Sequence, residues 1–171
     1  MAALNEFSRT FLVDPLPEGG LDFDLVANAA ERTAVARRLD ILALDRLEAD
    51  GRIDRDSATG GVVVSGTLRA AATQRCVVTL EPVPQAIDTE FRRLFAAEAD
   101  AAGDEIEIDP LAEQPEPLDG SLLDVGELVT EELSLALDPY PRATGVPEVA
   151  VGDVEAEPSG PFAALSRLRP S

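Results

Sequence analysis

The clearest pattern in this chain is the stretch VVVSGTLRAAATQRCVVTL, residues 62–80. Apolar residues occupy most of its even positions, namely Val62, Val64, Leu68, Ala70, Ala72, Cys76, Val78 and Leu80. Polar residues occupy most of its odd positions, namely Ser65, Thr67, Arg69, Thr73, Arg75 and Thr79. A period of two turns one face to a core and the other to water, so the stretch predicts a long β-strand. Because it is long for a single strand, we expect a bend or bulge at Gly66.

A return strand is expected directly after this stretch. The sequence Glu81-Pro82-Val83-Pro84-Gln85 favours a chain reversal. Beyond it, residues 87–95 place Ile87, Phe91 and Phe95 at alternating positions. The two strands predict a long antiparallel hairpin at the centre of a sheet.

Before the hairpin, the chain predicts two more strands. Residues 7–14 have the composition of a strand, and the turn residues at 15–20 end it. A second extended segment is expected at 21–26.

A helix is expected next, because Asn28 followed by Glu31 has the spacing of a capping box. Good helix formers continue to Asp40. Residues 41–46 alternate weakly between apolar and polar, and Ala49-Asp50-Gly51 indicates a turn.

After the hairpin, residues 98–121 are acidic, contain proline and hold few apolar side chains, which predicts a solvated loop. Residues 125–137 return to helical spacing, with Pro139 and Pro141 closing the helix. Residues 143–160 are expected to form a linker. Residues 161–169 predict a short terminal helix.

These segments together predict an α+β fold, with an antiparallel sheet around a long central hairpin and two main helices beside it. The domain is expected to cover residues 1–142 and to include the acidic loop. A flexible C-terminal tail with the short helix follows. At 171 residues, the chain has the length of one domain with appendages.

Missing residue types exclude many kinds of chemistry. The chain has no His, Lys or Trp, so 14 Arg form its whole basic complement. Imidazole-based zinc sites, Ser/His or Cys/His nucleophilic pairs and a Walker-type lysine cannot be built. We therefore expect a protein with no catalytic residues, no metal site and no cofactor. An enzyme that uses paired carboxylates remains the weakest alternative.

The location of the protein is also an expectation from sequence. The longest apolar runs are too short to span a bilayer, and the first residues lack the features of a secretory signal. A single cysteine, Cys76, cannot form an internal disulfide. We expect a cytoplasmic protein that does not enter a membrane.

The net charge of −19 is unevenly distributed. Residues 1–93 carry 11 Arg and 15 acidic residues, whereas residues 94–171 carry 3 Arg and 18 acidic residues. Such a chain disfavours phosphate backbones and favours basic partners, of which ribosomal proteins are an obvious class. The alternative is that the acidic surface only keeps the protein soluble.

Three segments resemble the large ribosomal RNA subunit accumulation (YceD) family. They are QRCVVTLEPV at 74–83, LDVGELVTEELSLALDPYP at 123–141 and PFAALSRL at 161–168. Many members have a Cys-x-x-Cys pair in the first segment, where this chain has Cys76 and Thr79, so one thiol cannot chelate zinc or form the pair's disulfide. The resemblance implies a non-catalytic cytoplasmic role in accumulating large-subunit ribosomal RNA. It also marks Cys76, Leu80, Glu81, Pro82, Glu132 and Pro139 as structural residues of the family motifs.

Two of these motif residues also have an interpretation from their own surroundings. Cys76 lies on the apolar face of its predicted strand, which favours a small buried hydrophobe over a reactive thiol. Glu132 lies on the apolar stripe of its helix and needs a donor such as Arg75 or Arg92. A structural ion pair is the preferred interpretation, ahead of a catalytic carboxylate.

Candidate partner contacts come from two places. Arg69 and Arg75 share a polar strand face that could bind RNA or acidic groups. The alternative is a solvated face paired with Asp88 and Glu90. The terminal helix offers the other contacts: Phe162, Leu165, Arg167 and Leu168.

The main hypothesis is an assembly factor that binds a basic ribosomal protein or a pre-ribosomal particle. The alternative is direct binding of ribosomal RNA through the arginine-bearing strand face.

Overall fold

The predicted hairpin forms the centre of the sheet in the computed structural model, which describes residues 6–57, 59–97, 115–118 and 120–145. Strand β4 (Val62–Arg75) pairs antiparallel with β5 (Pro82–Ala97), from Val62 opposite Phe95 to Arg75 opposite Pro82. The apolar face is confirmed, because the even positions of β4 from 62 to 72 are buried apart from Gly66.

The end of β4 differs from the expectation. The strand stops at Arg75, and residues 76–81 form the turn, with Val78 and Leu80 exposed. The N–H of Leu80 donates to the Cys76 carbonyl, and the N–H of Cys76 donates to the Glu81 carbonyl. These two hydrogen bonds close the turn, so β4 ends at Arg75.

Strand β3 (Ala43–Arg55) runs straight through the turn expected at 49–51, so that prediction is wrong. It pairs with β2 (Leu21–Val26) on one side and with β4 on the other. The expected bulge at Gly66 is also wrong. The register shift lies on β3, between Leu44 and Arg46.

One row of residues crosses four strands with two glycines at its centre. Phe23 lies opposite Gly51, Gly51 opposite Gly66, and Gly66 opposite Phe91. A Cβ on Gly51 would lie 2.6 Å from Cζ of Phe23, and one on Gly66 would lie 3.1 Å from Cζ of Phe91. The two rings therefore occupy the space that side chains at the glycines would need.

The first helix begins as predicted. The side chain of Asn28 accepts hydrogen bonds from the N–H groups of Ala30 and Glu31, and the Glu31 carboxylate accepts from the Asn28 N–H at 2.8 Å. This capping box starts α1 (Ala29–Arg38).

The second predicted helix is α3 (Val125–Ala136), which Asp124 caps. A small second sheet, absent from the sequence analysis, precedes it. There, β1 (Thr10–Leu12), shorter than the expected strand at 7–14, pairs with β7 (Leu122–Asp124).

The acidic segment expected to be a loop contains a strand. β6 (Glu116–Leu118) pairs parallel with Phe95–Ala97 of β5 and completes a sheet of order β2-β3-β4-β5-β6. The five-stranded sheet is therefore mixed rather than purely antiparallel. Residues 98–114 of the predicted loop, most of the linker and the terminal helix lie outside the described residues.

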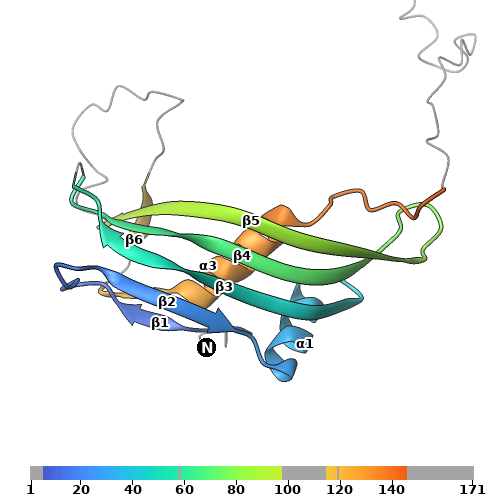
Figure 1. The fold of residues 1–171 in the computed structure, drawn as a ribbon, viewed down its shortest axis with the longest axis horizontal. Coiled ribbons are helices and arrows are strands. Elements are labelled where there is room, and N and C mark those ends of the chain that lie inside the picture. The colour runs from blue at the N-terminus through green and yellow to red at the C-terminus, as the bar shows by residue number, and fades with distance from the viewer. Residues whose placement is uncertain (1–5, 58, 98–114, 119, 146–171) are drawn as a thin grey trace, which may run out of the picture.

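Helix α3 crosses one face of the sheet (Figure 1), and ion pairs join it to that face and to α1. Nε of Arg93 on β5 lies 2.5 Å from the Glu132 carboxylate on α3, and the same guanidinium pairs with Glu116 of β6. Arg38 at the end of α1 pairs with Glu127 of α3 at 2.5 Å. The expected partner of Glu132 is thus corrected to Arg93, because Arg93 shares the core face of β5 that α3 crosses. Within the described ranges, neither helix has the length and apolar composition needed to cross a membrane.

Gly66→Ala should lower the free energy of unfolding by about 1 to 3 kcal/mol, the usual cost of overpacking a core. The new methyl group would lie 2.5 Å from the Asp50 carbonyl oxygen, and backbone cannot move aside as a flexible side chain can. Urea unfolding measures the change. Gly19→Ala is the matched control because nothing lies within 4 Å of its Cβ, and an equal effect of both substitutions would contradict the packing argument.

Glu132→Ala should destabilise the protein by about 1 to 3 kcal/mol more than Glu127→Ala. The Glu132 side chain is only 14% exposed, and its loss removes a partner from the partly buried Arg93. Glu127 also pairs with an arginine, but in a more exposed site. Thermal melting of the two variants under the same conditions makes the comparison, and equal melting temperatures would show that the Arg93 pair contributes no extra stability.

Candidate functional site

The sheet face opposite the helices is charged, and we call it the open face. Alternation along the strands places seven carboxylates and five arginines on it. The carboxylates are Asp22, Asp24, Glu48, Asp50, Asp54, Asp88 and Glu90, and the arginines are Arg46, Arg52, Arg69, Arg75 and Arg92. The open face therefore has an excess of negative charge.

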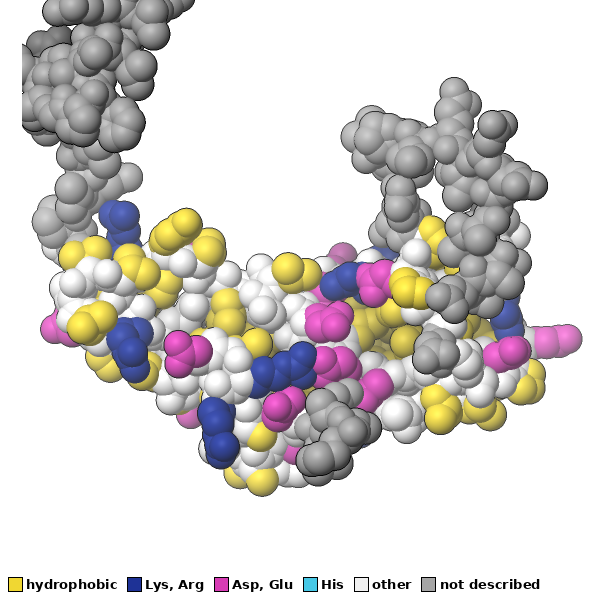
Figure 2. Space-filling model, turned by 180° about the vertical axis from the view of Figure 1, so that it is seen from behind, with side chains coloured by type: hydrophobic (Ala, Val, Ile, Leu, Met, Phe, Trp, Pro, Cys, Tyr) yellow, Lys and Arg dark blue, Asp and Glu magenta, His cyan; other side chains and the backbone are white. Residues whose placement is uncertain are grey.

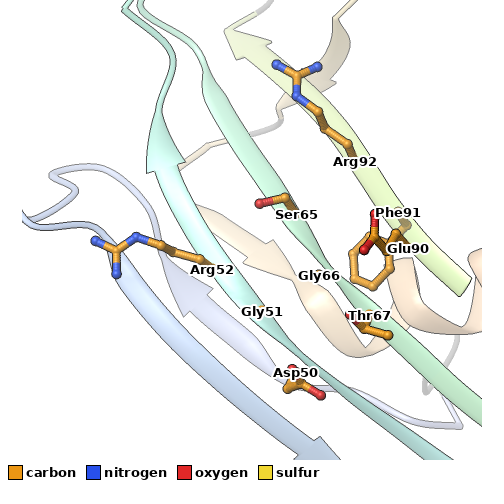
Figure 3. Close-up of a pocket in the computed structure, with 9 residues that line it drawn as sticks. All are labelled: Asp50, Gly51, Arg52, Ser65, Gly66, Thr67, Glu90, Phe91 and Arg92. Carbon is orange, nitrogen blue, oxygen red and sulfur yellow. The ribbon is translucent and has the colours of Figure 1, made fainter.

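A shallow hollow of about 570 Å³ lies in the middle of the open face (Figure 3). The backbones of Gly51 and Gly66 lie side by side at its centre, where β3 and β4 pair. Two cross-strand rows flank these glycines. One row is Arg52, Ser65 and Arg92, and the other is Asp50, Thr67 and Glu90.

Most arginines of the open face form ion pairs with carboxylates of the same face. Arg52 contacts Asp22 at 2.7 Å and Asp54 at 3.0 Å, and Arg46 contacts Glu48 at 2.6 Å. Arg69 donates to Asp50 and lies 4.0 Å from Asp88. Its pairing supports the solvated-face interpretation of Arg69 over a free phosphate contact.

We call the row of Asp24, Asp50, Thr67 and Glu90 the acidic row. Its carboxylates have fewer ion-pair and hydrogen-bond partners than the arginines have. Asp24 of β2 lies directly opposite Asp50 of β3, and like charges in that position destabilise a sheet. Within the part of the chain that the structure describes, the side chains of Asp24 and Glu90 make no ion pair or hydrogen bond. The row thus has carboxylates available for a cation.

This geometry suits the binding of a cationic side chain. Neighbouring strands lie about 4.8 Å apart, so the row from Asp24 across Asp50 and Thr67 to Glu90 spans about 14 Å. That length would accommodate more than one arginine or lysine. Among the described residues, no group of three His, Cys, Asp or Glu side chains could hold a metal ion.

Arg69 and Arg75 both lie at odd positions of β4, on one strand face as predicted, but six residues apart. Arg69 is paired with carboxylates of the open face. Arg75 ends β4 at the turn and makes no side-chain hydrogen bond or ion pair to any described residue. Phe162, Leu165, Arg167 and Leu168 lie outside the described residues.

Two of the segments similar to the family motifs come together at the β4–β5 turn. The N–H of Val77 donates to the Pro141 carbonyl at 2.9 Å, and the Gln74 side chain donates to the Asp138 carbonyl at 2.9 Å. Four further motif residues belong to these two segments: Leu80 and Glu81 in the turn, Pro82 at the start of β5, and Pro139 after α3. Glu132 lies within α3, where it pairs with Arg93.

Cys76 lies at the centre of this junction and is fully buried, as predicted, but in the turn rather than on the apolar face of the strand. Its Sγ accepts hydrogen bonds from the backbone N–H groups of Thr79 and Ala143, each at 3.4 Å. Hydrogen bonding from Thr79, with a further contribution from Ala143, lowers the pKa of the Cys76 thiol to about 6. The sulfur therefore holds the turn against the chain that follows α3.

The acidic row was missed in the sequence analysis, although a signal for it exists. Residues Leu47-Glu48-Ala49-Asp50-Gly51-Arg52-Ile53-Asp54 alternate apolar or small with charged residues through the expected turn. This period of two predicts a strand with one charged face.

Stability should depend on pH through Cys76. The folded chain holds the thiol at a pKa of about 6, below its ordinary 9.0, so thiolate stabilises the folded state. That contribution is fully present above pH 9 and is lost as the pH falls through about 6. The free energy of unfolding of the wild type, minus that of Cys76→Ser, should therefore rise from pH 6 to pH 9. Urea titrations across this range measure the difference, and a constant difference would mean that the thiol is not perturbed.

Comparison with known proteins gives one match. A family model described as "Large ribosomal RNA subunit accumulation protein YceD" matches residues 64–169, more than half of the chain. The match begins within β4 and runs through the turn, β5, β6, β7 and α3 to the segment after α3. No curated protein and no solved structure matches the chain.

Proposed function

The chain belongs to the large ribosomal RNA subunit accumulation (YceD) family, and from that premise we propose that it is a non-catalytic ribosome assembly factor. It binds a basic ribosomal protein, or a pre-ribosomal particle that exposes one, through the acidic row of the open face. It acts in the cytoplasm, where large-subunit ribosomal RNA accumulates.

The acidic row carries this proposal. Asp24 lies opposite Asp50, whose charge Arg69 offsets, and Glu90 extends the same row beyond Thr67. Asp24 and Glu90 have no cationic partner among the described residues. A bound arginine or lysine would supply that partner, and the net charge of −19 would speed the approach of a basic protein.

Two observations favour this function over its alternatives. Direct RNA binding through the strand face is less well supported, because Arg69 is bound to Asp50 and the open face is negative overall. A catalytic role is disfavoured because the chain has no His or Lys and because its single thiol is enclosed.

The test compares two double variants of the tagged full-length chain in a pull-down from growing cells. Asp24→Asn with Glu90→Gln should lower the recovery of basic ribosomal proteins by about 5- to 10-fold, because close charge pairs carry much of the binding energy. The control, Glu18→Gln with Asp45→Asn, has the same net charge but keeps the acidic row. Quantitative mass spectrometry of the recovered proteins and RNA provides the readout.

A stability measurement separates binding from misfolding. Asp24→Asn removes a like-charge contact, so it should leave the melting temperature unchanged or raise it while binding falls. If both double variants lose ribosomal proteins equally, overall charge rather than the acidic row attracts them. If neither double variant lowers the recovery of ribosomal proteins, the open face is not the binding surface.

A further inference from the structure

The end of the molecule that holds the β4–β5 turn exposes large hydrophobic side chains. We call this surface the hairpin end and define it by residues 74–81 and 134–142. Its exposed members are Val77 (49%), Val78 (49%), Leu80 (68%), Leu135 (73%) and Tyr140 (71%). Figure 2 shows hydrophobic side chains gathered at this end, on the left of the view. Such a group at one site is typical of an interaction surface.

A groove of about 590 Å³ runs across the hairpin end. Its walls come from the chain after α1, the end of β4 and the end of α3. The lining includes Leu39, Ile41, Val77, Leu135, Pro139 and Pro141. The hydrogen bond from Val77 to Pro141 holds two of these walls together, so the groove is a fixed feature of the fold.

The charges of the hairpin end are balanced, unlike those of the open face. Arg75 and Arg142 have no ion pair or side-chain hydrogen bond within the described ranges. Two carboxylates, those of Glu81 and Asp138, belong to the same surface. The surface thus carries two charges of each sign in a chain of net charge −19, so two copies of it can pair arginines with carboxylates.

The balance of charge at the hairpin end makes a basic protein or a nucleic acid a poorer partner than a second copy of the chain. A basic protein is attracted more strongly to the acidic row, and nucleic acid needs a surface with net positive charge. A two-fold contact between identical surfaces, by contrast, brings each group of one copy against a different group of the other. Arginines of one copy can then face carboxylates of its partner, around a central apolar contact.

We propose that the hairpin end binds a second copy of this chain, so that the protein is a two-fold dimer joined end to end. Leu80, Tyr140 and Leu135 form the apolar centre of the contact. Arg75 and Arg142 lie at its rim, opposite carboxylates of the other copy. This arrangement leaves the open face of each copy free, and it is independent of the function proposed above.

Sedimentation velocity of the full-length chain, from about 5 to 500 µM, tests the proposal across the range of weak to moderate affinities. The wild type should shift from monomer to dimer within this range. Leu80→Asn should raise the dissociation constant at least about 10-fold, as the loss of a central apolar contact does. Asparagine suits this position, because Leu80 has φ 65°, a conformation that asparagine adopts more readily than leucine.

Matched controls show whether the contact lies at the hairpin end. Leu122→Asn removes an exposed leucine from β7 and should leave the dissociation constant unchanged. Arg75→Glu should weaken the dimer about 10-fold, whereas Arg55→Glu makes the same charge change away from this surface and should have a much smaller effect.

Two results would overturn the proposal. One is a wild type that stays monomeric at every concentration, which would mean that no second copy binds the hairpin end. The other is a dimer that neither Leu80→Asn nor Arg75→Glu weakens relative to its control, since the contact would then lie elsewhere.

Discussion

The contact between Gly51 and Gly66 decides how the core packs across the sheet. On the core face, the absence of two side chains leaves room for the rings of Phe23 and Phe91, which pack over the two inner strands. On the open face, the backbone of the same two residues forms the floor of the hollow, as backbone does at any position whose side chain would point into the core. The glycines therefore serve the packing of the core, and the flanking side chains give the hollow its charge.

Arg93 has a corresponding role on the helix side. Its guanidinium lies between the carboxylates of Glu116 and Glu132, and so it joins β5, β6 and α3. Because the side chain is three-quarters buried, its charge needs both partners to offset the loss of water. The helix is therefore held to the sheet by a polar contact as well as by its apolar stripe.

The parts of the fold that sequence predicted are those controlled by nearby residues. The β4–β5 hairpin follows from alternation, and α1 begins where Asn28 and Glu31 form their capping box. Errors arose where pairing with distant residues decides the outcome. Ala49-Asp50-Gly51 has turn composition, but between β2 and β4 it is held extended, and β6 and β7 are too short to leave a pattern. The partner of Glu132 depends on which face of β5 meets α3, so helix spacing alone could not choose Arg93.

The candidate site was predicted only in part. The alternation of β4 predicted that its arginines share a polar face, but the acidic row is formed by the register between four strands, which the sequence alone does not give.

The uninterrupted ladder between β4 and β5 sets a fixed distance between the two surfaces described above. Every residue from Val62 to Arg75 has a partner on β5, without a bulge. From Gly66 in the hollow to Arg75 at the turn, nine residues of extended chain span about 30 Å. The hairpin therefore acts as a rigid spacer, which holds whatever occupies one surface a constant distance from whatever occupies the other. A partner that extends less than this distance along the hairpin from the hollow would leave the far end accessible, so the two contacts could be made at once.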